Sequence, residues 1–361
     1  MHVGLVMECD YRQGRTQEEA FQEAFRIAEL AEECGVDGVW IAERHFATHR
    51  RSNDPMGAGI PSVVSVPLVW AAAIAARTTN LRVATGVSVL PLCHPIRLAE
   101  EAATVDQISR GRLDFGVGRS GFPRSYNGYG ISYGESRDRF NESLEIIRKA
   151  WTDERLTYEG KYYSFNELAV MPRPYQKPHP PIRVAATTRD TFPMVGQLGL
   201  PLVSGLRGFT IPEVAHNLKA YRAALDEFGH SKDGDVYLRV PIYVAESDEQ
   251  GINEPRESTM RSYRRLGENF GLSASAPGTD ISEERRERYE RLSNITYEEL
   301  LEDRLAYGSP DTVARKLKHL INELGLSGVI MEPNVGGQLT EEQVLNSIRL
   351  YGEEVAPKLR G

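Results

Sequence analysis

The sequence predicts an α/β protein built on a (β/α)8 TIM barrel, with insertions after the second, fourth and seventh strands. Three observations indicate this fold. Short apolar runs alternate with amphipathic helical stretches, eight such pairs follow one another, and no linker divides residues 1–361. We therefore expect one domain. An open doubly wound sheet is the alternative, and it would require several of the short strands to be absent.

The first half of the chain supplies four strand–helix pairs. In the first pair, apolar side chains recur at helical spacing after a short apolar run, and Gly35 ends the helix. A polar loop at 46–62 follows the second strand. The predicted strands are 3–7, 38–42, 81–90 and 113–117, and the predicted helices are 17–34, 63–76, 95–109 and 135–152.

The second half opens with a predicted hairpin at 156–165, which turns at Glu159-Gly160. Residues 245–280 later interrupt the alternation and include the soft stretch 267–278, so we expect a mobile loop insertion that acts as a lid. The predicted strands are 182–186, 202–205, 236–245 and 328–332, and the predicted helices are 192–198, 212–228, 282–293, 297–306, 311–324 and 341–351.

The bulk composition is that of an ordinary globular enzyme. Hydrophobic residues make up 40% of the chain, and the net charge of −8 argues against a nucleic-acid-binding surface. No apolar run of about 18 residues occurs, so no membrane span is expected. The first ten residues lack the features of a signal peptide, which favours a cytoplasmic location. The three cysteines are too widely spaced to indicate a disulfide framework or a metal site.

A glycine motif, Gly116-Val-Gly-Arg-Ser-Gly121, follows the fourth predicted strand and fits the pattern G-x-G-x-x-G. On that basis an NAD-linked dehydrogenase with a Rossmann site is one interpretation. A Rossmann site needs a helix to open inside the glycine run, whereas proline and glycine after Gly121 indicate a loop over 120–134. We therefore favour a strand end that delivers Arg119 to an anionic group.

An anion site is predicted where the fourth and fifth strands end, because TIM-barrel active sites lie at the carboxyl ends of the strands. Arg119 comes from the fourth strand, and Thr187, Thr188 and Thr191 follow the fifth. A guanidinium, several hydroxyls and a helix N-terminus together suit a phosphate. For the threonines alone, an ordinary helix cap is the simpler interpretation.

A second candidate group is Glu43-Arg44-His45, which follows an apolar strand directly. It is either an ion pair on the barrel rim or a group that transfers protons at a bound ligand, with His45 the best-placed titrating side chain. His94 lies a few residues beyond the third strand, where it is either a site residue or only a helix-start residue. No metal-binding pattern accompanies these residues, and we expect no metal.

Taken together, the chain resembles the bacterial luciferase-like flavin monooxygenase family over nearly its whole length. The resemblance depends on the order and spacing of several segments. They are 34–46 (Cys-Gly-Val-Asp-Gly-Val-Trp-Ile-Ala-Glu-Arg-His-Phe), 83–91, 94–101, 106–112 and 308–311. It implies a TIM barrel, usually a homodimer, that binds reduced FMN or a related deazaflavin.

The resemblance also implies roles for individual residues. Arg119 matches the arginine that holds the flavin phosphate, and Thr188 and Thr191 match its hydroxyl partners, with the backbone of Ala186 and Thr187 nearby. Gly86-Val87 matches a non-proline cis peptide beneath the isoalloxazine ring.

One departure concerns Arg44, which stands where the aldehyde-using luciferases have a histidine. Arginine stays protonated and cannot act as a base, which argues against light emission but not against oxygenation. His45 remains in register with the family's second histidine. We expect Arg44 to stabilise an anion, and His45, with Glu43, to handle protons.

The function implied is that of a flavin-dependent monooxygenase. A separate reductase would supply reduced FMN, and a flavin peroxide formed with O2 would oxygenate a small organic substrate while a lid excludes water. A deazaflavin-dependent hydride-transfer enzyme and a non-catalytic flavin-binding subunit are the alternatives.

Overall fold

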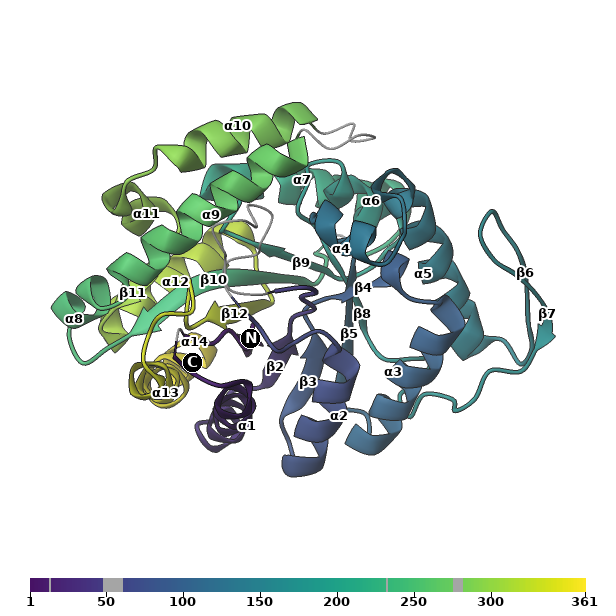
Figure 1. Cartoon of the computed structure of the whole chain (residues 1–361), viewed down its shortest axis with the longest axis horizontal. Helices are drawn as coiled ribbons and strands as arrows, with labels where there is room; N and C mark the ends of the chain where they lie inside the picture. The colour runs from purple at the N-terminus through teal and green to yellow at the C-terminus, as the bar shows by residue number, and fades with distance from the viewer. Residues whose placement is uncertain (13, 48–60, 232, 275–281) are drawn as a thin grey trace.

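A closed ring of parallel strands forms the centre of the protein in a computed structural model, with helices packed around it (Figure 1). The structure describes residues 1–12, 14–47, 61–231, 233–274 and 282–361. The ring closes because β10 pairs in parallel with both β9 and β12. In ring order the strands are β1 (His2–Met7), β2 (Gly38–Ile41), β3 (Arg82–Thr85), β5 (Leu113–Gly118), β8 (Ile182–Ala185), β9 (Leu202–Gly205), β10 (Val236–Val244) and β12 (Gly328–Glu332).

The predicted (β/α)8 barrel is therefore confirmed, and the open doubly wound sheet is wrong because the pairing of β9 with β10 leaves the ring no edge. The helices that cover it are α1 (Gln17–Glu33), α2 (Pro67–Arg77), α3 (Pro95–Ser109), α4 (Pro123–Gly128), α5 (Ser136–Thr152), α6 (Thr191–Gln197), α7 (Ile211–Glu227), α12 (Pro310–Leu324), α13 (Glu341–Leu350) and α14 (Ala356–Arg360). Short helical turns are η1 (Leu90–Leu92), η2 (Tyr133–Glu135) and η3 (Tyr351–Val355).

Local sequence signals set where several helices begin. The N-cap threonines of α1 and α7 each accept a hydrogen bond from the backbone N–H three residues on, and a glutamate at that position bonds back. This reciprocal pair satisfies backbone donors that the first helical turn leaves free. Gly35, with φ of +76°, follows α1 in the left-handed conformation that glycine adopts at low cost.

Alternation along the strands separates two apolar layers. Val3, Leu5 and Met7 of β1 face the helices, whereas Val6 lies in the barrel lumen beside Trp40 of β2. This period of two is what a strand packed on both faces requires. Trp40 is 1% exposed and fills the lumen below the carboxyl ends of the strands, so ligands can only enter above it.

The predicted strand 81–90 is interrupted in the middle. β3 ends at Thr85, the peptide between Gly86 and Val87 is cis, and β4 (Ser88–Val89) then pairs with β5. The cis peptide that the family resemblance implies is thus confirmed.

Two glycines of the G-x-G-x-x-G motif in β5 allow this strand to approach Thr85 and Val87 closely. A Cβ on Gly116 would lie 1.9 Å from the carbonyl oxygen of Thr85, and one on Gly118 would lie 2.7 Å from a methyl carbon of Val87. Neither position has room for a side chain, so the first two glycines of the motif serve barrel packing.

The described parts of two insertions contain more helix than predicted. The segment 120–134 contains the short helices α4 and η2, and the predicted loop after strand seven is helical over α8 (Asp248–Asn253) and α9 (Arg256–Ala274). Much of the polar loop after strand two, residues 48–60, and residues 275–281 lie outside the described residues. α10 (Ser282–Ser293) then packs along α9, and α11 (Tyr297–Asp303) follows (Figure 1).

Two further strand pairs lie outside the ring. The predicted hairpin is confirmed as β6 (Leu156–Glu159) and β7 (Ser164–Leu168), which projects at the periphery (Figure 1). A strand that the sequence analysis missed, β11 (Ala306–Gly308), pairs in parallel with the end of β10. Its three residues are too short to stand out as an apolar run.

Candidate active site

Glu43 and His45, which directly follow β2, form a buried hydrogen-bonded dyad. A carboxylate oxygen of Glu43 lies 2.8 Å from Nε2 of His45, and the two side chains are 5% and 8% exposed. The other carboxylate oxygen of Glu43 accepts the backbone N–H of Val89, at 3.0 Å. Because Val89 lies two residues beyond the cis peptide, β4 fixes the dyad beside Gly86-Val87.

Arg44 forms ion pairs with two acidic residues that follow β1. Its Nη1 donates to Glu8 at 2.6 Å and to Asp10 at 2.7 Å. Burial opposes the charged form, but these two carboxylates raise the pKa of Arg44 above its ordinary value. Arg44 is therefore an internal ion-pair residue of the barrel rim, the first of the two interpretations that its sequence position allowed.

The same ion-pair network continues across the barrel mouth. Glu8 also binds Arg239 of β10, which binds Glu332 at the end of β12, and Glu332 accepts from Arg207 at 2.9 Å. Arg239 and Glu332 are well placed to hold β10 and β12 in register. The sequence analysis missed Arg239 and Arg207, although an arginine inside the apolar strand 236–244 was a usable signal.

The carboxyls of the network differ in their acidity. Burial works against ionisation of Glu8, but Arg239 and Arg44 hold its pKa well below the ordinary value. Asp10 shares Arg44 with Glu8 and is more deeply enclosed, so burial raises the pKa of Asp10 to about 7. One guanidinium thus serves two carboxyls whose proton affinities are driven apart.

Arg119 has the opposite character, because its guanidinium is half-buried and has no hydrogen-bond or ion-pair partner in the described part of the chain. Burial, reinforced by the nearby charge of Arg137, lowers the pKa of Arg119 below its ordinary value. Its backbone carbonyl is fixed by the hydroxyl of Tyr126 from α4. A cation held in place without an internal acceptor is suited to an external anion.

The predicted threonine hydroxyls are connected to this guanidinium through Asp190. The Thr188 hydroxyl lies 2.8 Å from the Thr191 hydroxyl and 2.8 Å from a carboxylate oxygen of Asp190, whose charge acts on Arg119. Asp190 is also paired with Arg137 of α5. Arg137 was not predicted, because α5 lies far along the chain from the strand ends.

The backbone groups of the remaining predicted cofactor residues, Ala186 and Thr187, are bonded within the protein. The N–H of Ala186 bonds to Val203 and its carbonyl accepts from the Ser204 hydroxyl, so this residue is fixed in the barrel wall. The carbonyl of Thr187 accepts from Arg288 of α10 at 2.8 Å. The helices after β10 are thereby tied to the predicted phosphate end of the site.

His94 contacts the β6–β7 hairpin. It is the exposed N-cap residue of α3, and its ring packs edge-to-face on Tyr163 and Phe165 of the β6–β7 hairpin, at centroid distances of 5.2 and 5.9 Å. The structure agrees with the second interpretation, in which His94 is a helix-start residue. A catalytic role for His94 gains no support from these contacts.

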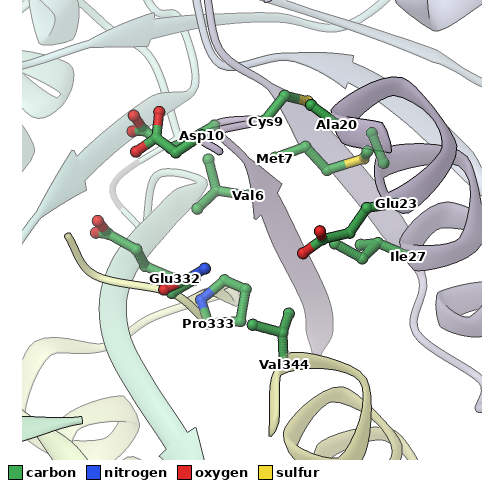
Figure 2. A pocket seen from close by; sticks show the side chains of 13 residues that line it. Val6, Met7, Cys9, Asp10, Ala20, Glu23, Ile27, Glu332, Pro333 and Val344 are labelled. Atoms are coloured by element: carbon green, nitrogen blue, oxygen red, sulfur yellow. The ribbon is translucent and has the colours of Figure 1, made fainter. Parts of the chain in front are cut away.

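A small cavity of about 50 Å³ lies behind the ion-pair network, between β1, α1 and the connection from β12 to α13. Figure 2 shows the carboxylates of Asp10 and Glu332 on one side of it and Glu23 of α1 on the other. Ligand sites are typically several hundred Å³. At this volume the cavity does not have room for a flavin.

The structure is thus a closed TIM barrel with a buried acid–histidine dyad, and among the described residues the guanidinium of Arg119 has no internal partner. Both features follow strands of the barrel at their carboxyl ends, where TIM-barrel enzymes have their active sites. No helix within the described residues is long and apolar enough to cross a bilayer.

Comparisons with known proteins narrow this class. A family model described as "Luciferase-like monooxygenase" matches residues 1–328. The alkanal monooxygenase alpha chain of Photorhabdus luminescens is 24% identical over 357 residues, which cover 96% of this chain and 93% of that protein.

Two solved structures are similar to this chain, and each match covers 99% of this chain and 99% of the solved one. The monooxygenase RslO1 of Streptomyces bottropensis has a TM-score of 0.78 at 26% identity. The oxygenating constituent of 3,6-diketocamphane monooxygenase from Pseudomonas putida, in complex with FMN, has a TM-score of 0.77 at 23% identity.

The chain belongs to the luciferase-like monooxygenase family. It is accordingly an oxygen-incorporating flavin enzyme, as the sequence predicts.

Proposed function

We propose that this protein uses reduced FMN, delivered by a separate reductase, and O2 to oxygenate a small organic substrate. The observation that carries the proposal is the half-buried guanidinium of Arg119, which has no acceptor among the described residues. The charge of Asp190 acts on it, and Asp190 is hydrogen-bonded to Thr188, whose hydroxyl meets that of Thr191. Such a cation needs an anion, and the phosphate of FMN is one.

The residues present fit the cofactor. Arg119 would bind the phosphate, and Thr188 and Thr191 would donate their hydroxyls to it. Arg137 stands next to Arg119 and is now paired with Asp190, so it offers a second positive charge. The ring would lie over Gly86-Val87, next to the Glu43–His45 dyad. When bound, reduced flavin supplies the two electrons that activate O2.

The dyad would hold the proton that oxygenation consumes. Glu43 orients His45 through Nε2, and the backbone N–H of Val89 fixes Glu43 in turn. Arg44 keeps its charge and joins β1 to β2 through Glu8 and Asp10, which shapes the floor of the site instead of transferring protons.

Water exclusion would fall to the helices after β10. Arg288 of α10 is 4% exposed, donates to Thr187, and stacks over the rings of Phe209 and Phe270 at 4.1 and 5.5 Å. Because Arg288 contacts both Thr187 and Phe270 of α9, movement of α9 would be coupled to the phosphate end of the site. We keep the proposal that the segment 245–280 acts as a lid.

Two features of the partners are also proposed. The diketocamphane relative is the oxygenating constituent of its monooxygenase, which supports a two-component system with a separate reductase. Phe21 of α1 and Val66 and Val69 at the start of α2 are 41%, 52% and 66% exposed, which supports a homodimer through this face.

The test is to mix the protein without oxygen with reduced FMN or with a reduced deazaflavin, and then to admit O2. The proposal expects retention of reduced FMN and stoichiometric O2 consumption. Retention of the deazaflavin alone, with no O2 consumption, would favour hydride transfer. Binding of reduced FMN without any reaction would favour a non-catalytic subunit.

A further inference from the structure

We infer that Tyr129 completes a proton relay with Glu43 and His45, and that its hydroxyl is the end of the relay that faces the reacting atoms. The inference rests on the proposed function, and it assigns to a loop aromatic a role that the sequence alone did not indicate. It depends on three hydrogen bonds that join β2, β4 and the residue after α4.

The three bonds form one continuous chain. The backbone N–H of Val89 donates to Glu43, Glu43 lies 2.8 Å from Nε2 of His45, and Nδ1 of His45 lies 3.1 Å from the hydroxyl of Tyr129. Both ring nitrogens of His45 are therefore engaged. Among the described residues, the hydroxyl of Tyr129 is therefore the group through which His45 can exchange a proton with a ligand.

The roles of the two nitrogens follow from the partners. An ionised Glu43 only accepts, so Nε2 of His45 carries a proton in either charge state. In neutral His45, Nδ1 accepts the Tyr129 O–H. In protonated His45, Nδ1–H donates to the Tyr129 oxygen, which leaves the phenolic O–H free to donate outward.

Local packing fixes the position of Tyr129. Its ring meets the ring of His45 edge-on at a centroid distance of 4.9 Å and lies 5.7 Å from the ring of Phe46. A Cβ on the preceding Gly128 would lie 2.1 Å from the Phe46 ring, so glycine is required for this approach. Phe46 itself has φ of +55°, a conformation unusual for an aromatic residue.

The phenol is suited to act as a donor. Burial, aided by the charge of Glu43, raises the pKa of Tyr129 above its ordinary value, so the hydroxyl stays protonated at neutral pH. Tyr129 is nevertheless 48% exposed, whereas His45 and Glu43 are almost fully enclosed. Within the described part of the chain, Tyr129 is therefore the exposed end of the relay.

The proton balance of the proposed reaction requires such a supply. When bound, the reduced FMN monoanion would supply two electrons, one oxygen atom of O2 would enter the substrate, the other would leave as water, and one proton would be consumed. The Tyr129 O–H bond would break as its proton moves to the oxygen atom that leaves as water, and the Nδ1 proton of protonated His45 would move to the phenolic oxygen. His45 would then be neutral, with its Nε2–H still donating to Glu43, and solvent would return the proton that the relay has lost.

The variant Tyr129→Phe removes the hydroxyl and keeps the ring. Tyr175→Phe is the control, because Tyr175 is 54% exposed and packs near Gly111, at the opposite end of the barrel. In the cofactor-free protein, 15N spectra of the imidazoles should show the Nδ1 signal of His45 moving toward that of an unbonded nitrogen in Tyr129→Phe only. A merely structural tyrosine would not produce this shift.

Kinetics with reduced FMN and O2 as the probes complete the test. Tyr129→Phe should bind reduced FMN as the wild type does but reoxidise it about 10- to 100-fold more slowly, within the range of general acid catalysis. His45→Gln combined with Tyr129→Phe should be no slower than the slower single variant.

The outcomes separate the two claims. Reoxidation at the wild-type rate in Tyr129→Phe, an unmoved Nδ1 signal, or losses that multiply in the double variant would each overturn the relay while leaving the proposed function in place. If reduced FMN bound to the wild-type protein did not react with O2 at all, the proposed function itself would be overturned.

Discussion

Replacing Arg119 by alanine should separate a cofactor-binding arginine from a structural one. In the described residues this guanidinium has no internal partner, so its removal breaks no hydrogen bond and leaves no acceptor unsatisfied. Burial already disfavours its charge, as the lowered pKa of Arg119 indicates. The cofactor-free variant should therefore be as stable as the wild type, or slightly more stable.

Binding of reduced FMN should respond very differently. A hydrogen bond to a charged group contributes about 1.5–3 kcal/mol, and a guanidinium can donate two to one phosphate. A loss of about 3 kcal/mol corresponds to a rise in Kd of about 100-fold. Anaerobic calorimetry with reduced FMN measures Kd, and thermal unfolding of the cofactor-free protein measures stability.

A matched control is Arg97→Ala. Arg97 is 74% exposed and pairs with Glu101 on the surface of α3, where an ion pair contributes little. It should change neither Kd nor Tm. The reasoning is refuted if Arg119→Ala binds reduced FMN with wild-type affinity, or if it lowers Tm of the cofactor-free protein by several degrees.

Three further substitutions test the account of the fold and the rim. Burial lowers the pKa of His2 from 6.5 to about 4, so the contribution of neutral His2 to stability is fully present above pH 6.5, and about 3 kcal/mol of it is lost as the pH falls to 4. In His2→Gln the free energy of unfolding, measured with urea, should therefore depend less steeply on pH across this window. An equal pH dependence in the variant and the wild type would count against this role of His2. Gly116→Ala places a Cβ 1.9 Å from the Thr85 carbonyl and should cost about 3 kcal/mol or more, visible as a lower Tm. Arg44→Met leaves two carboxylates without their shared cation, including Asp10 at 8% exposure, and should cost about 2–4 kcal/mol in chemical unfolding, whereas a neutral result would mean that the rim network is not structural.

The barrel was predictable because its evidence is local. Each strand is a short apolar run, and each helix carries its own stripe and, in several cases, its own capping pair. The position of the dyad was predictable for the same reason, because Glu43 and His45 are two residues apart and follow one strand. The helical nature of 248–274 was missed because α9 faces the core partly with small hydroxyl residues such as Ser258, Thr259 and Ser262.

Pairings between distant strands were not predictable. Nothing near Arg44 in the sequence indicates that Glu8 and Asp10 would take its charge, since these acids come from β1. Tyr129 similarly reaches His45 across 84 positions of sequence. Such contacts depend on how the ring closes and how tightly the connections pack, and no periodic pattern in the sequence encodes either.

The central claim is that Arg119 binds the phosphate of the flavin, and the phosphate itself provides the most direct measurement. Reduced FMN and reduced riboflavin differ only in that group, so their dissociation constants should be compared in the wild type and in Arg119→Ala. We predict that the wild type prefers FMN by about 100-fold and that the variant loses most of this preference. Equal affinities in the wild type, or a preference that survives in the variant, would contradict the claim.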